Sequence, residues 1–66
     1  SADMSYQDIL ITAMKREEKS HDLYTRLAAE YKDENVQNLF KKLASEEAKH
    51  KLHFETIYDN EILKED

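Results

Sequence analysis

Apolar residues recur along the chain at alternating steps of three and four, the spacing that places side chains on one stripe of an α-helix. Two seams follow this rule: Leu10, Ala13, Glu17, Ser20, Tyr24, Leu27 and Tyr31 form the first, and Val36, Phe40, Leu43, Glu47, His50, Phe54 and Ile57 form the second. The chain has no glycine or proline that would break a helix. The pattern therefore predicts an all-α chain of two helices.

Capping signals mark where the first helix begins. Ser5 is a favoured N-cap residue, and Asp8 stands three positions later, where its carboxylate can reach back to the backbone of Ser5. Met4 and Ile9 have the spacing of a hydrophobic staple around this cap. We therefore expect the first helix to run over about residues 5–31.

The turn between the helices is expected where the apolar pattern stops. Residues 32–35 contain no apolar side chain and include two N-cap candidates, Asp33 and Asn35. This predicts a turn over about residues 32–34 and a second helix over about residues 35–61. The 66 residues then form a single domain, an antiparallel two-helix hairpin.

Each apolar stripe is wider than a two-stranded coiled coil uses. The first seam is flanked by Ile9, Met14, Leu23 and Ala28, and the second by Leu39, Ala44 and Tyr58. A stripe of this width needs more than one neighbouring helix, and one hairpin offers only one. We therefore expect a homodimer or a higher oligomer in which two hairpins form a four-helix bundle.

Composition narrows the choice of partners and compartment. Fifteen acidic and ten basic residues give a formal charge of -5, which disfavours a nucleic-acid partner. No apolar run approaches the ~20 residues that span a bilayer, and the polar start of the chain does not resemble a signal peptide. With no cysteine to form a disulfide, a soluble, cytoplasmic protein without a membrane partner is expected.

Three ionisable residues interrupt the seams at positions where a core excludes charge: Glu17 in the first helix, and Glu47 and His50 in the second. If the turn is centred near residue 32, residues whose numbers sum to 64 face each other across the hairpin. Tyr24 then faces Phe40, as Leu10 and Phe54 face each other near the open end. The same register brings Glu17 opposite Glu47 at mid-height, so the two polar interruptions meet.

The spacing of Glu47 and His50, Glu-x-x-His, puts both side chains on one face of the helix about one turn apart. A two-fold axis through this layer would gather Glu17, Glu47 and His50 from two hairpins. One Glu from each of two helices and a Glu-x-x-His from each of the other two is the ligand set of di-iron and di-manganese carboxylate bundles. We therefore predict two iron ions per dimer, with manganese as the alternative.

Simpler roles exist for each of these residues. Glu17 could pair with His21, and Glu47 with Lys51, as ordinary surface pairs four residues apart. Tyr24 is either a core aromatic residue or a second-shell residue whose hydroxyl bonds to a metal ligand. A further Glu-x-x-His, which ends at His21, lies one step off the seam and is expected to be solvated.

The motifs in these seams resemble one helical hairpin of the rubrerythrin family, within the ferritin-like superfamily. The residues that carry the resemblance are Ala13-Met14-Lys15-Arg16-Glu17, Tyr24 with Leu27-Ala28, and Phe40 with Leu43-Ala44-Ser45-Glu46-Glu47-Ala48-Lys49-His50. The resemblance covers about residues 8–60. It implies that Glu17, Glu47 and His50 are iron ligands in a ferritin-like four-helix bundle, and that the activity is Fe(II) oxidation or peroxide reduction.

Two departures from the family pattern bear on function. The family's usual domain has four helices in one chain, so this hairpin is either a natural half-bundle, as in encapsulated ferritins, or a fragment. Many rubrerythrins also bind a second iron through cysteines, which this chain lacks, so an external electron donor or ferrous iron itself would supply electrons. The alternatives to an oxidoreductase are an iron-handling half-ferritin and a metal-free structural hairpin.

Overall fold

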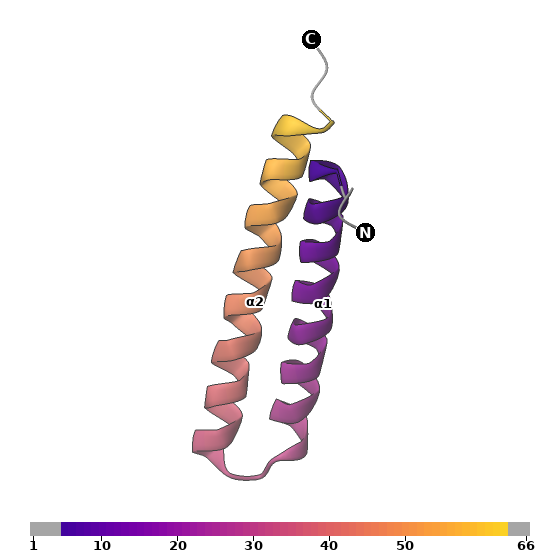
Figure 1. Cartoon of the computed structure of the whole chain (residues 1–66). Helices are drawn as coiled ribbons and strands as arrows, with labels where there is room; N and C mark the ends of the chain where they lie inside the picture. The colour runs from indigo at the N-terminus through magenta and orange to yellow at the C-terminus, as the bar shows by residue number, and fades with distance from the viewer. Residues whose placement is uncertain (1–4, 64–66) are drawn as a thin grey trace.

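Two antiparallel helices, joined by a short link, make up the fold (Figure 1). The computed structural model describes residues 5–63, in which α1 runs Tyr6–Glu30 and α2 runs Glu34–Glu61. The predicted all-α hairpin is confirmed. Residues 31–33 form the link, one position earlier than the expected turn, so α2 also begins one residue earlier than expected. Pairing into a four-helix bundle lies beyond a single hairpin and stays a prediction.

Side-chain caps fix the start of each helix. The Asp8 amide donates to Ser5 Oγ at 3.1 Å and the Ser5 amide donates to Asp8 Oδ2 at 3.4 Å, which completes the capping box. Asp33, and not Asn35, caps α2, because its Oδ1 accepts from the Val36 amide at 3.1 Å. The proposed staple involves Met4, which lies outside the described residues.

The register of the hairpin agrees with the expected pairing. The Tyr24 and Phe40 rings stack with their centroids 6.1 Å apart, and the Tyr31 ring stacks on Phe40 at 5.6 Å. These three rings hold the link end of the hairpin together. At the open end, the Tyr6 hydroxyl donates to Glu61 Oε2 at 2.8 Å, so polar contacts hold the helices where the apolar seam ends.

The hairpin has almost no closed core. Among the described residues, the buried hydrophobic side chains are only Leu10, Ala28 and Ala44, whereas Ile9 and Leu39 are more than half exposed. The accessible surface of the chain is 5397 Å². This exceeds the ~4,400 Å² expected of a compact monomer of this mass, as suits an elongated hairpin.

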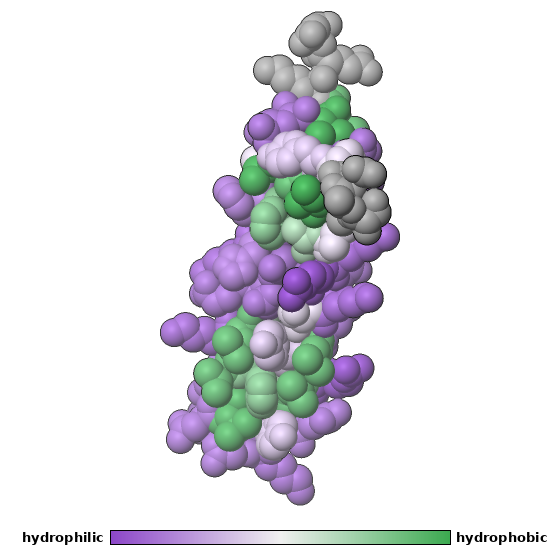
Figure 2. Space-filling model, in the orientation of Figure 1, coloured by the Kyte–Doolittle hydropathy of each residue, from purple (hydrophilic) through white to green (hydrophobic). Residues whose placement is uncertain are grey.

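The uncovered apolar surface lies mainly in two patches. Figure 2 shows one face of the hairpin with an apolar patch near the link, another toward the open end, and a hydrophilic belt across the middle. The Cα positions span only 11 Å in their thinnest direction, so the hairpin is a single layer of helices. A single layer cannot bury this face by itself. Neither helix is long and apolar enough to cross a membrane over the residues described.

Candidate metal centre

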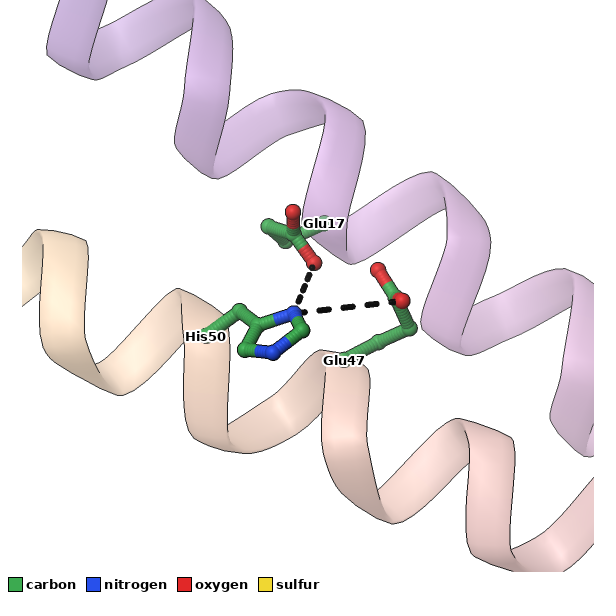
Figure 3. Close-up of side chains that lie close together, drawn as sticks. All are labelled: Glu17, Glu47 and His50. Carbon is green, nitrogen blue, oxygen red and sulfur yellow. Dashed lines mark ion pairs between the residues drawn. The ribbon is translucent and has the colours of Figure 1, made fainter.

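The three ionisable residues of the seams converge at the middle of the hairpin. Figure 3 shows Glu17 pointing from α1 toward Glu47 and His50, which project from successive turns of α2. Each residue offers a donor atom, and these atoms all lie within 4.8 Å of one another. All three residues occupy seam positions, so their side chains point from each helix toward the other helix. A register that matches Tyr24 with Phe40 thus also brings Glu17 to Glu47.

The imidazole of His50 lies between the two carboxylates. Its Nδ1 is 3.4 Å from Glu17 Oε2 and 4.0 Å from Glu47 Oε1. The carboxylate side chains are only 20% and 21% exposed, whereas that of His50 is 55% exposed. The two carboxylates are therefore largely shielded by the hairpin, whereas the imidazole is open to solvent.

The two carboxylates stand close enough to perturb one another. The pKa of Glu47 is raised because its protonated carboxyl shares a hydrogen bond with Glu17, with smaller contributions from burial and from repulsion by the Glu17 charge; His50 opposes the rise. The folded, metal-free site therefore holds a proton on the carboxyl of Glu47 more tightly than an isolated glutamate does. Negative charge in this layer is not fully compensated by the described side chains.

Glu17 Oε2 is a buried acceptor that lacks a hydrogen-bond donor. The contact with His50 Nδ1 reaches ion-pair distance but does not satisfy this oxygen as a hydrogen bond, and it gains from charge only when the imidazole is protonated. An unpaired buried carboxylate oxygen is costly, and a bound cation relieves that cost. The orphaned oxygen therefore fits a metal site.

The chemistry of the donors also fits iron or manganese. Carboxylate oxygens and an imidazole nitrogen suit divalent metals of intermediate hardness, and each hairpin supplies two carboxylates and one imidazole. Two hairpins would supply four carboxylate charges, which balance two divalent ions. The residues present thus match half of the ligand set of a di-metal carboxylate bundle.

The simpler surface pairs do not form. His21 Nδ1 lies 3.6 Å from Asp22 Oδ1, and Lys51 Nζ lies 3.6 Å from Glu18 Oε2. The side chains expected to neutralise Glu17 and Glu47 at the surface are therefore engaged elsewhere. The second Glu-x-x-His, from Glu18 to His21, does not converge with a third ligand, because Glu18 pairs across the hairpin with Lys51.

Tyr24 has the position of a core aromatic residue, since its ring packs on Phe40. In the described part of the chain its hydroxyl makes no hydrogen bond to the metal group, and a bond to a metal ligand stays a prediction. Arg16, which was not among the predicted site residues, lines the hollow beside Glu17 and Glu47. Its only signal was a positive charge next to a seam position.

A comparison with protein-family models identifies the family of the chain. The protein-family model described as Rubrerythrin matches residues 8–66, so the match spans both helices and includes Glu17, Glu47 and His50. The resemblance seen in the sequence motifs is confirmed by this match. No curated protein and no solved structure matches the chain.

Proposed function

This chain belongs to the rubrerythrin family, and from that premise we propose that it is a di-iron carboxylate oxidoreductase whose site forms between two hairpins. The reaction is Fe(II) oxidation or peroxide reduction. The observation that carries the proposal is the convergence of Glu17, Glu47 and His50 around a buried carboxylate oxygen that lacks a donor. Such a layer is unfavourable as a structural core and favourable as a cation site.

The second hairpin is proposed to be another copy of the chain. Exposed apolar side chains of the described residues, among them Ile9, Leu23 and Leu39, give a second copy of the chain apolar surface to bury. A two-fold axis through the hydrophilic belt of Figure 2 would set apolar patch against apolar patch and belt against belt. The dimer would then hold two metal ions, iron with manganese as the alternative.

Each side chain has a separate role in this proposal. Glu17 and Glu47 would hold the cations by charge, and a bound cation would counter the effects that raise the pKa of Glu47. His50 contributes a neutral nitrogen and adds no charge to the site. Bound iron would supply the electrons that reduce peroxide or dioxygen. An external electron donor or further ferrous iron as substrate would restore them.

The test is metal content in matched histidine variants. The chain carries two Glu-x-x-His motifs, so His50→Ala and His21→Ala remove the same chemical group at the same motif position. Protein purified without a metal-affinity step and loaded anaerobically with Fe(II) should hold two ions per dimer. His50→Ala should lose most of this iron while remaining helical by circular dichroism, and His21→Ala should keep it.

Loss of Fe(II) in air, followed with a ferrous-specific chelator, and consumption of hydrogen peroxide then measure the reaction. Both should fall in His50→Ala and persist in His21→Ala. If His50→Ala binds iron as the parent does, the ligand assignment is wrong. Sedimentation of the parent should show a dimer or a multiple of it, and a folded monomer at micromolar concentration would contradict the shared site.

A further inference from the structure

Arg16 lines a hollow beside the candidate metal centre. It lines the same hollow as Glu17, Glu47 and Ser20, with the Phe54 ring as part of the wall. The residue is exposed, and its long side chain can therefore move over the face of the hairpin. Neighbours in a helix sequence do not face each other, so it is the shared hollow, and not adjacency to Glu17, that relates Arg16 to the carboxylates.

The two lysines that flank His50 in the sequence are already engaged in ion pairs. Lys51 pairs with Glu18, and Lys49 pairs with Glu46 at 3.5 Å. Among the residues that the structure describes, Arg16 takes part in no ion pair or side-chain hydrogen bond. A permanently charged, uncommitted guanidinium thus stands beside two carboxylates.

The two carboxylates lack a hydrogen-bond donor that carries a permanent positive charge. Glu17 Oε2 is buried without a donor, and the imidazole of His50 compensates charge only when protonated. A guanidinium presents several N–H donors in a planar fork that matches a carboxylate. One positive charge cannot balance two carboxylates, whereas a divalent ion can, so an entering metal has the advantage over an arginine.

We propose that Arg16 is the counter-ion of the metal-free site: its guanidinium binds the Glu17 and Glu47 carboxylates until an entering metal ion displaces it. Arg16 thereby lowers metal affinity and stabilises the empty protein. The inference rests on the proposed metal site, but it concerns a residue that is not a ligand. Arg16 would change the metal affinity of the carboxylates without contacting the substrate.

The test compares Arg16→Gln with Lys15→Gln. Both variants remove one positive charge from adjacent positions of α1, but Lys15 is exposed and does not line the hollow. Isothermal titration with Mn(II), which avoids oxidation, measures affinity in the assembled protein. Urea unfolding in the presence of a chelator measures the stability of the metal-free protein at one protein concentration.

Arg16→Gln should bind Mn(II) about tenfold more tightly than the parent, which corresponds to about 1.4 kcal/mol, and Lys15→Gln should stay within about twofold. The metal-free urea midpoint should fall more in Arg16→Gln than in Lys15→Gln. Equal affinities and equal midpoints in the two variants would overturn the role of Arg16. If the parent binds no metal, the proposed function fails, and the metal-free midpoints still decide whether Arg16 is a counter-ion.

Discussion

Replacing Glu17 by Leu should stabilise the metal-free protein even though it removes a ligand. The Glu17 side chain is only 20% exposed, and a buried acceptor without a donor costs about 1–3 kcal/mol. A largely buried leucine adds about 1–2 kcal/mol of apolar burial. Loss of the ion contact with the half-exposed His50 subtracts at most about 1 kcal/mol. At low pH, loss of the hydrogen bond that Glu17 shares with the protonated Glu47 carboxyl subtracts about 1 kcal/mol more. The net expectation is a gain of roughly 1–4 kcal/mol in the free energy of unfolding.

The gain should be larger at pH 8 than at pH 5. The pKa of Glu47 is raised in the folded state, chiefly by its hydrogen bond with Glu17, so the native state binds this proton more readily than the unfolded chain does. Stability therefore falls as pH rises from the ordinary pKa of a glutamate, about 4.3, through the raised value. Glu17→Leu removes the partner that raises the pKa and should flatten this dependence.

Urea melts at pH 5 and pH 8, with chelator and at fixed protein concentration, measure the effect. Glu17→Gln is the matched control, because the amide removes the charge but keeps a polar group where a donor is missing. We expect its gain to be smaller than that of Glu17→Leu. Glu17→Leu should also lose metal-dependent oxidation. A Glu17→Leu protein that is less stable than the parent at both pH values would refute the convergence of unpaired carboxylates.

Three further predictions concern the cap, the open face and the metal. Asp33→Ala should lower the free energy of unfolding by about 1 kcal/mol, because the α2 cap is lost. Asn35→Ala should lower it by less than about 0.5 kcal/mol. Urea melts that rank the two variants in the opposite order would contradict the cap. Leu39 lies three helical turns before His50 on the same side of α2, whereas Leu52 lies on the opposite side from His50. Leu39→Lys should therefore dissociate the dimer in sedimentation, and Leu52→Lys should not. Mn(II) at a hundred times its Kd should stabilise the parent by about 2.7 kcal/mol, reversed by chelator; a urea midpoint that Mn(II) does not move would count against the site.

The bounds of the two helices and the register between them could be predicted from the residue pattern alone. Apolar spacing and capping residues are local signals, and no helix-breaking residue opposes them. The register followed from the position of the turn, and the stacking of Tyr24 on Phe40 agrees with it. Because one register fixes every facing pair of a hairpin, the meeting of Glu17 with Glu47 could be anticipated before any side chain was placed.

Candidates that look alike in the sequence are distinguished by how the two helices pack. Two residues could cap α2, and the residue that caps it is Asp33 because the helix begins at the next position. Two Glu-x-x-His motifs share the same spacing, but only the one ending at His50 meets a glutamate from the other helix, while Glu18 pairs with Lys51. The packing of the two helices also places Arg16 in the hollow that Glu17 and Glu47 line. Periodicity assigns a residue to a face of its own helix, whereas its neighbours across the hairpin depend on how the two helices pack.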